Sequence, residues 1–453
     1  MPPRRHSKPP RKRRAPPRED RPHLQSETDV LIDLVAEWRA SSEAPRHLLR
    51  RRADRLRALA SRERRDVEQL LFAYVRWRSR VDAVVERAVE LLPAEAPRTD
   101  PRRQTLLARA TLRALGLVAE GGTDTALTPG EARAVEEAIA TPVKRHAPAT
   151  RLAERHAFPL EIVSELLERL GEEEAARALD ALNQRAPLVL RPRPPGAADE
   201  VLRALADDGI GARLHAQIPD ALVIDERVQL ERHPVLRRGL AEVQDAASQL
   251  AVRALDLSPG QTVIDYCAGG GGKAAAMADL LGARGHLVLM DVDARRLSRA
   301  RRRTQPVGGL RLETQVHDGN QAPPARLHGC ADRVLVDAPC SGLGTVRRHP
   351  DLTWRFDRAA LQALTSQQRR LTVHASALLR PGGRLLYVTC SLRREENEAV
   401  ADQLTADTSL RPLALSAALG DLADALGAVG STLTLWPHRH DSDGFFLALF
   451  EQP

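Results

Sequence analysis

Residues 265–273 read D-Y-C-A-G-G-G-G-K, and this stretch decides the fold of the C-terminal half of the chain. It follows an apolar, β-rich run at Thr262–Tyr266 and precedes a helical pattern. Glycines at a strand-to-helix turn let backbone N–H groups approach a ligand, and the helix N-terminus favours negative charge. The spacing matches neither G-x-x-x-x-G-K-[ST] nor G-x-G-x-x-G, so it favours neither a P-loop nor a standard dinucleotide site.

Strand and helix patterns alternate beyond this turn. Further β-rich runs are His286–Met290, Arg311–Val316, Arg333–Asp337, Arg384–Thr389, Thr432–Trp436 and Phe445–Phe450. This alternation predicts a Rossmann-like α/β domain with a seven-stranded, mostly parallel sheet and helices on both faces. Such sheets bind ligands at the carboxyl ends of their strands, near the point where the strand order reverses.

Acidic residues follow the second and third predicted strands. Asp291 ends the second strand, where a carboxylate can accept hydrogen bonds from both ribose hydroxyls of a nucleoside. Asp318 follows the third strand, within reach of an adenine edge. Either acid alone is as readily explained as a helix cap. Together, the glycine loop followed by Asp291 and then Asp318 predicts an adenosine-containing ligand.

Two of the four cysteines have positions that suggest chemistry. The four are Cys267, Cys330, Cys340 and Cys390, too few for a disulfide scaffold, and no C-x-x-C pair or His/Cys cluster predicts a metal site. We expect Cys330 to be a small buried hydrophobe. Cys340 and Cys390 follow the fourth and fifth strands, at the same rim as the glycine loop, and a thiolate there is a strong nucleophile.

The region before this domain has a different pattern of apolar residues. Residues 26–145 read as helices, which predicts an all-α bundle with Tyr74 and Trp77 in its core. Its clearest apolar stripe consists of Val67, Leu71, Tyr74, Val81 and Val85. Residues 146–235 read as a helical connector, with a helix at Leu160–Leu170 stopped by Gly171, and a small α/β module. The module's elements are strands at Leu188–Leu190, Ala212–His215 and Ala221–Ile224 and a helix at Asp199–Asp207.

Most of the net charge of +8 lies at the N-terminus. Residues 1–22 hold nine Lys or Arg and two acids, which leaves about +1 for the rest of the chain. We expect residues 1–25 to be a disordered basic tail that either holds phosphates or only solubilises the protein. The four predicted parts are 1–25, 26–145, 146–235 and 236–453.

The C-terminal part resembles the Sun/nucleolar-protein family of RNA cytosine-5 methyltransferases. The matching stretches are V-Q-D-A-A-S (243–248), D-Y-C-A-G-G-G-G-K (265–273), D-V-D-A-R-R-L (291–297), D-A-P-C-S-G-L-G-T-V-R-R-H-P-D (337–351), T-C-S-L-R-R-E-E-N-E (389–398) and P-H-R-H-D-S-D-G-F-F (437–446). The glycine loop departs from the family's usual C-A-A-P-G-G-K-T at Gly269, Gly270 and Ala274 but keeps its length and Lys273. Upstream, A-L-N-Q-R-A-P-L-V-L-R (181–191) resembles the segment that opens the family's small RNA-contacting module, but Pro192 and Arg193 follow it where the family usually has Val-Asn.

Residues 26–145 more weakly resemble the NusB-like domain of the bacterial small-subunit rRNA methyltransferases of the RsmB type, best at 55–78. These resemblances imply an enzyme that uses S-adenosylmethionine and methylates RNA, with 16S rRNA favoured. They imply a nucleophile at Cys390 and a release role for Cys340. Asp337 is a candidate for the acid that the reaction needs beside the base. The implied cofactor contacts are Cys267, Ala268, Gly269, Gly270, Gly271, Gly272, Lys273, Asp291, Arg296, Asp318 and Asp337.

A thiol is needed because carbon 5 of cytosine is too weak a nucleophile to attack a methylsulfonium. Addition of a thiolate to carbon 6 makes carbon 5 enamine-like, while an acid near ring nitrogen 3 stabilises the developing charge. A base then removes the carbon 5 proton and the thiol is eliminated. The residues alone leave open which of Cys340 and Cys390 attacks, and whether Cys340 is the base or the release group.

Two other classes of function remain open: a methyltransferase acting on a protein or small molecule, and a non-catalytic RNA-binding assembly factor on the same fold. The first leaves both rim cysteines without a use, and the retained Lys273, Asp337, Cys340 and Cys390 argue against the second. No run of 18 apolar residues and no secretory signal is present, so we expect a cytoplasmic, monomeric protein with no membrane segment.

Overall fold

The computed structural model describes residues 27–453 except 42, 94–99, 119–126, 142–146, 225–227, 229, 305–306 and 356. The predicted basic tail lies outside the described residues. The chain divides into two compact units, one of residues 1–74 and 81–141 and the other of residues 75–80 and 142–453. Among the described residues, no helix combines the length and apolar character needed to cross a membrane.

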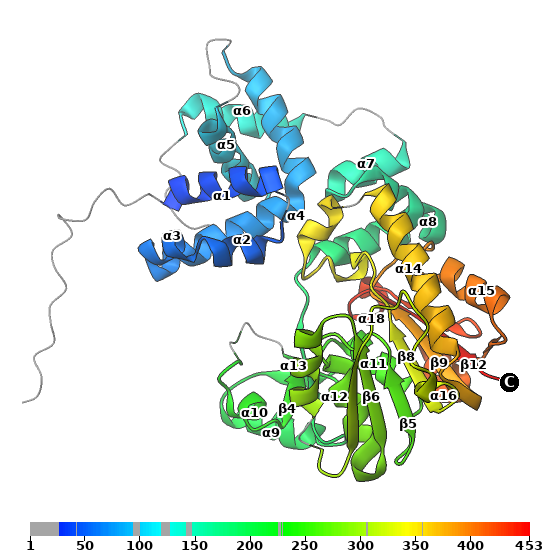
Figure 1. The fold of residues 1–453 in the computed structure, drawn as a ribbon. Helices are drawn as coiled ribbons and strands as arrows, with labels where there is room; N and C mark the ends of the chain where they lie inside the picture. Colours follow the sequence, from blue (N-terminus) through cyan, green and yellow to red (C-terminus); the bar gives the residue numbers. More distant parts are fainter. Residues whose placement is uncertain are drawn as a thin grey trace, which may run out of the picture. The chain divides into compact units, whose positions relative to one another are not determined.

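The first unit consists of helices within its described ranges (Figure 1). They are α1 (Glu27–Ser41), α2 (Pro45–Arg51), α3 (Ala53–Ala58), α4 (Ser61–Leu91), α5 (Pro101–Ala114) and α6 (Pro129–Ala140). All five residues of the predicted apolar stripe are buried. Tyr74 is buried as predicted, but Trp77 is only half-buried, and α4 departs from helical geometry at this residue, with φ −106° and ψ 15°.

The second unit begins with α7 (Pro148–His156) and α8 (Leu160–Asn183), which is kinked at Gly171, where the sequence predicts a stop. A small antiparallel sheet follows in the order β2-β3-β1-β4. Its elements are β1 (Leu188–Pro192), α9 (Ala198–Asp207), β2 (Ala212–Leu214), β3 (Leu222–Ile224), α10 (Pro234–Arg237) and β4 (Ala241–Val243). The sequence predicted no strand at β4, which is three residues long and pairs with β1.

The large sheet has the order β10-β12-β9-β8-β5-β6-β7, with β11 also paired to β12. Strands β5 to β9 are parallel, and β12 is antiparallel to β9. The predicted strands appear as β5 (Thr262–Asp265), β6 (His286–Asp291), β7 (Arg311–Val316), β8 (Ala331–Asp337), β9 (Leu379–Thr389), β11 (Thr432–Leu435) and β12 (Phe445–Glu451). The short β10 (Arg411–Pro412) shares the edge of β12 with β11 and was not predicted.

Both faces of this sheet are covered by helices, because successive strand residues alternate between two apolar clusters. Val263 and Leu289 belong to the cluster packed by α11 (Ala246–Arg253), α12 (Gly272–Leu281) and α13 (Ala294–Thr304). Ile264 and Met290 belong to the opposite cluster, packed by α14 (Arg358–Ser376) and α15 (Glu398–Asp407). The remaining short helices are α16 (Ser416–Leu419), α17 (Asp421–Ala425) and α18 (Pro437–His440).

The chain reverses direction across the sheet between β5 and β8. From β5 it runs outward through β6 to β7, and it then returns to β8 on the other side of β5. The crevice at the carboxyl ends of β5 and β8 is therefore where a doubly wound sheet binds its ligand. The glycine loop follows β5, Cys340 follows β8 and Cys390 follows β9.

Candidate active site

The glycine loop forms a cradle at the end of β5. Gly269 and Gly271 both have positive φ angles, 53° and 81°. A Cβ atom on Gly271 would lie 2.5 Å from the Cα atom of Ala300 in α13, so only glycine allows this close packing. A Cβ atom on Gly270 would meet no atom within 4 Å, which leaves that side of the loop open to a ligand. The loop is fixed to β6 by the Ala268 N–H, which donates to the Met290 carbonyl at 2.8 Å.

Asp291 holds the same loop from the end of β6. Its Oδ2 accepts a hydrogen bond from the Gly269 N–H at 2.8 Å, and its Oδ1 accepts one from the Asp293 N–H at 2.9 Å. Each carboxylate oxygen has a second lone pair, so the group can still accept from a ligand hydroxyl. Asp291 therefore shapes the cradle as well as lining it.

The floor of the cradle carries an excess of negative charge. Asp265 is buried, and its Oδ1 has no hydrogen-bond partner within the described part of the chain. Burial, together with the nearby Asp337 carboxylate, raises the pKa of Asp265 to about 7, although Lys273 opposes this shift. Asp265, Asp291 and Asp337 thus face a single lysine, an arrangement that favours a positively charged ligand.

Lys273 forms an ion pair with Asp337, the residue that ends β8. The Lys273 Nζ atom lies 2.6 Å from the Asp337 Oδ2 atom and 5.2 Å from the centre of the Phe445 ring. Burial disfavours the lysine charge, but Asp337, Cys390 and Asp265 together raise the pKa of Lys273 above its ordinary value. The site therefore keeps a fixed positive charge next to Cys390.

The two rim cysteines meet at the end of β8 and β9. The Sγ atoms of Cys340 and Cys390 lie 3.3 Å apart, and both residues are half-buried free cysteines. The contact with Cys390, burial and the Glu396 carboxylate raise the pKa of the Cys340 thiol well above its ordinary value. Cys340 therefore keeps its proton at neutral pH and can donate an S–H hydrogen bond to the sulfur of Cys390.

A buried carboxylate, Glu396, joins the two cysteine loops. It accepts hydrogen bonds from the Ser341 N–H at 2.7 Å and from the Ser341 hydroxyl at 2.5 Å, and it also accepts one from the Ser391 hydroxyl. Gln368 of α14 donates to it at 3.1 Å. Since Ser341 and Ser391 directly follow the two cysteines, Glu396 fixes the separation of the thiols. Glu396 gives no local sign of this role in the sequence, because an acid in R-R-E-E-N-E reads as part of a solvated charged run.

Two backbone segments cross next to this pair of loops, at Gly344 and Gly444. The Gly344 N–H donates to the Cys390 carbonyl at 2.9 Å, and the Gly444 N–H donates to the Gly344 carbonyl at 2.8 Å. A Cβ atom on Gly344 would lie 1.9 Å from the Gly444 carbonyl oxygen. Three backbone segments therefore meet at a point that admits no side chain.

A second charged cluster lies on residues of three matched sequence stretches. The Arg348 guanidinium contacts the Asp443 carboxylate at 2.7 Å and the Asp245 carboxylate at 2.9 Å. Burial and the neighbouring Asp245 raise the pKa of Asp443 to about 6. These three residues were not predicted as a cluster, since nothing in their local sequence patterns shows that they meet.

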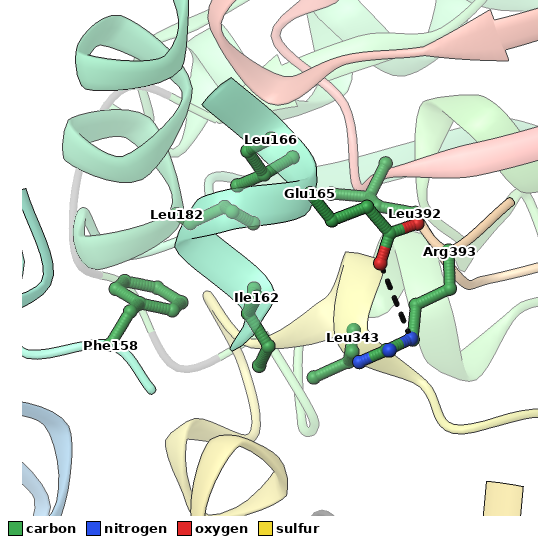
Figure 2. A pocket seen from close by; sticks show the side chains of 8 residues that line it. All are labelled: Phe158, Ile162, Glu165, Leu166, Leu182, Leu343, Leu392 and Arg393. Carbon is green, nitrogen blue, oxygen red and sulfur yellow. Dashed lines mark ion pairs between the residues drawn. The ribbon is translucent and has the colours of Figure 1, made fainter. Parts of the chain in front are cut away.

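Helix α8 packs against the residues that follow the two cysteines (Figure 2). A small pocket remains between them, and its only charged lining residues are Glu165 and Arg393, whose Oε2 and Nε atoms lie 3.4 Å apart. The lining residues are Phe158, Ile162, Glu165, Leu166, Leu182, Leu343, Leu392 and Arg393. The apolar lining indicates a packing interface that supports the cysteine loops from outside the crevice.

Some predicted site residues lie away from this cluster. Arg296 is exposed on the first turn of α13, with its Nε atom 3.7 Å from Asp293. Asp318 is exposed and accepts a hydrogen bond from the Asn320 N–H at 2.9 Å, and hydrogen bonds from Asn320 lower its pKa. Burial and Asp265 raise the pKa of Cys267 well above its ordinary value, so it remains a thiol. Cys330 is half-buried rather than buried, and its Sγ donates to the Leu327 carbonyl at 3.1 Å.

Three features define the class of protein. They are a glycine cradle after the first strand of a doubly wound sheet, an acid at the end of the second strand, and a cradle floor whose negative charge suits a cationic ligand. The fold and the site are those of an S-adenosylmethionine-dependent methyltransferase. The model of the family described as 16S rRNA methyltransferase RsmB/F matches residues 252–451, and the model of that family's ferredoxin-like domain matches residues 158–231.

Comparison with known proteins agrees with these matches. The chain is 33% identical to ribosomal RNA small subunit methyltransferase B from Xanthomonas campestris pv. campestris, over 86% of this chain and 89% of that one. It is 35% identical to the protein of the same name from Sodalis glossinidius, but there it spans only 61% of the relative's length, with 60% of this chain aligned. The chain belongs to the RsmB/F family of 16S rRNA methyltransferases.

A solved structure supports the fold. The chain is similar to a methyltransferase homolog protein from Pyrococcus horikoshii, with a TM-score of 0.55 and 24% identity, over 68% of this chain and 100% of that one. Among the residues that the structure describes, no group of three or more His, Cys, Asp or Glu side chains is arranged to hold a metal ion.

Proposed function

We propose that this protein methylates carbon 5 of a cytosine in 16S rRNA, in the cytoplasm, through a covalent adduct with Cys390. The observation that carries the proposal is the pair of thiols, 3.3 Å apart, beside the Lys273–Asp337 ion pair at the carboxyl ends of the central strands. The family relationship and the names of the relatives support 16S rRNA as the substrate. A methyltransferase acting on oxygen or nitrogen has no need of two thiols at this position.

The cofactor would lie in the cradle formed by residues 267–273, Asp265 and Asp291, where it supplies an electrophilic methyl group. The open side of Gly270 and the unpartnered oxygen of Asp265 fit such a ligand, since its sulfonium charge would compensate the excess of carboxylates. We also propose that Asp318 faces the adenine end, because it lies two residues after the carboxyl end of β7. Arg296 is the weakest member of the predicted set, because its guanidinium is already paired and exposed.

The protein's own side chains have separate roles in the reaction that we propose. Cys390 forms a bond from its sulfur to carbon 6 of the cytosine, which leaves negative charge on the ring. Lys273 and Asp337 lie beside Cys390, and Asp337 is the group we assign to the nitrogen 3 edge of the base. There Asp337 passes a proton from its ion-pair partner Lys273 to nitrogen 3 as negative charge builds on the ring, and takes it back when the thiol leaves. After methylation the carbon 5 proton leaves to a base, the carbon 6–sulfur bond breaks and its electron pair returns to Cys390. Cys340, which holds a proton next to that sulfur, assists this release.

The product of the reaction tests this proposal. Purified full-length protein would be incubated with 16S rRNA and S-adenosylmethionine labelled in the methyl group, and the RNA would be digested to nucleosides. Labelled 5-methylcytidine is expected with the natural protein and none with Cys390→Ala. A different labelled nucleoside, or label on protein alone, would refute the cytosine-5 assignment. Binding of RNA without any transfer would favour an assembly factor.

A further inference from the structure

An exposed basic surface lies on the second unit, next to strand β4. Helix α10 contacts β4, and Glu242 of β4 pairs with Arg303 of α13 at 3.0 Å, so both helices are neighbours of this strand (Figure 1). What we call the α10–α13 surface consists of the exposed arginines at the C-terminal end of α10 and the exposed arginines along one face of α13. Its members are Arg237, Arg238, Arg295, Arg299 and Arg302.

Helix α13 points a stripe of arginines directly away from the protein core. Arg295, Arg299 and Arg302 are spaced by four and three residues, so they share one helical face. The residues Leu297, Ala300 and Thr304 on the opposite face are buried. The three guanidinium groups therefore project into solvent as a row along the helix.

Among the described residues, no ion pair compensates the charge of this surface. Residues 294–304 contain six arginines and no acid. Glu242 and Asp293 form ion pairs with Arg303 and Arg296, whereas the five arginines of the surface form no ion pair within 4 Å in the described part of the chain. Like charges four residues apart destabilise a helix, and a surface that serves only solubility mixes both signs. The pattern is therefore explained by a polyanionic partner.

We propose that the α10–α13 surface binds the phosphodiester backbone of the RNA substrate outside the catalytic crevice. This inference rests on the proposed function only in taking RNA as the substrate. Arginine presents a planar set of donors that matches the oxygens of a phosphate, so a row of arginines can follow successive phosphates of one strand. Since α13 packs on Gly271 of the cofactor loop, an RNA strand held here lies on the same unit as the two thiols.

The test measures binding to an oligouridylate of about forty nucleotides, which contains no cytosine and so cannot be a substrate. Three full-length proteins would be compared. They are the natural chain, the α13 variant Arg295→Gln, Arg299→Gln, Arg302→Gln, and a control variant in which three other exposed arginines are replaced by glutamine. The control residues are Arg369, Arg370 and Arg411. The dissociation constant would be measured over a range of salt concentrations. The double variant Arg237→Gln, Arg238→Gln tests the α10 side separately and serves if the α13 variant does not fold.

Each phosphate contact with single-stranded RNA contributes about 0.7 to the slope of log affinity against log salt. The α13 variant is expected to bind several-fold more weakly, with a slope shallower by about two, while the control variant keeps the natural slope. An unchanged slope in the α13 and α10 variants, or an equal fall in the control, would overturn the proposal. Loss of binding to phosphatidylglycerol vesicles without loss of oligouridylate binding would identify a lipid surface instead and also overturn it. Failure to form 5-methylcytidine would not affect this result, because no reaction is measured.

Discussion

The sulfur atoms of Cys340 and Cys390 lie 3.3 Å apart, although fifty residues separate the two cysteines in the chain. The parallel pairing of β8 with β9 brings the two loops to the same edge of the sheet, and Glu396 then binds the serine after each cysteine. The separation of the thiols is therefore set by a buried carboxylate that does not belong to the reacting pair.

Replacing this carboxylate should slow the reaction without weakening the cofactor site. Glu396→Gln keeps the shape of the side chain but replaces one of its two acceptor oxygens with an NH2 group. Either the two serine hydroxyls or the Ser341 N–H and the Gln368 amide then lose their acceptor, so the cysteine loops should shift. We expect kcat to fall about tenfold or more, since small displacements of reacting groups are costly. The KM for S-adenosylmethionine should remain within about twofold, because no part of Glu396 contacts the proposed cradle.

The matched control for this prediction is Glu395→Gln. Glu395 is the preceding residue, and it contacts neither Ser341 nor Ser391: it pairs with the exposed Arg358 and with the buried Arg393. Arg393 keeps its ion pairs with Glu161 and Glu165 when Glu395 is replaced. The replacement of Glu395 should leave kcat nearly unchanged. Equal losses of kcat in the two variants would mean that Glu396 has no special positioning role.

Cofactor affinity should depend on pH through Asp265. The pKa of this buried carboxyl is raised to about 7, and a positively charged ligand binds better when the carboxyl has lost its proton. S-adenosylmethionine affinity should therefore rise as the pH increases through about 7, with release of a proton on binding. Calorimetric titration at pH 6 and pH 8, in buffers of different ionisation enthalpy, measures both quantities.

Asp265→Asn supplies the control for this pH effect. Because the folded-state pKa of Asp265 is raised, its contribution to stability is present below the unfolded-state pKa and is lost as the pH rises through about 7. The amide variant should therefore unfold at a higher temperature than the natural protein at pH 8 when no cofactor is present, and its cofactor affinity should no longer change near pH 7. A pH dependence that survives in the variant would exclude Asp265 as its source.

Gly344→Ala should destabilise the protein at the crossing next to the cysteine loops. The new Cβ atom would lie 1.9 Å from the Gly444 carbonyl oxygen and 2.9 Å from the Cys390 carbonyl oxygen, so backbone segments must separate. We expect a loss of about 1–3 kcal/mol in the free energy of unfolding, the usual effect of overpacking. Gly308→Ala should change stability by less than about 0.5 kcal/mol, since no atom lies within 4 Å of the position. Denaturant unfolding of both variants provides the comparison.

The sequence was informative wherever a buried strand gives a continuous apolar run. The strands β5, β6, β8 and β9 were predicted for this reason, and the glycine loop and both cysteines were identified from their positions at the strand ends. The short β4 and β10 have two or three residues each, too few to form a recognisable pattern. Trp77 was predicted to be in the core, but a kink within α4 cannot be read from helical spacing.

The missing parts of the site are contacts between distant segments. Glu396 and the Asp245–Arg348–Asp443 cluster depend on which loops the sheet brings together, and an acid or arginine in a charged run gives no local sign of burial. Asp291 was predicted as a ribose ligand, but its backbone contacts with Gly269 and Asp293 could not be foreseen. Such side chains are found only when the strand order is known.

The assignment of Cys390 as nucleophile and Cys340 as release group is the central claim. It is tested by incubating Cys390→Ala and Cys340→Ala with 16S rRNA and methyl-labelled S-adenosylmethionine, followed by denaturing electrophoresis. Cys390→Ala should form neither an adduct nor methylated RNA, because no sulfur adds to carbon 6. Cys340→Ala should still methylate but release slowly, so a methyl-labelled protein–RNA species should accumulate. A stable adduct that appears with Cys390→Ala and disappears with Cys340→Ala would reverse the two roles, and full activity in both variants would contradict the thiol mechanism.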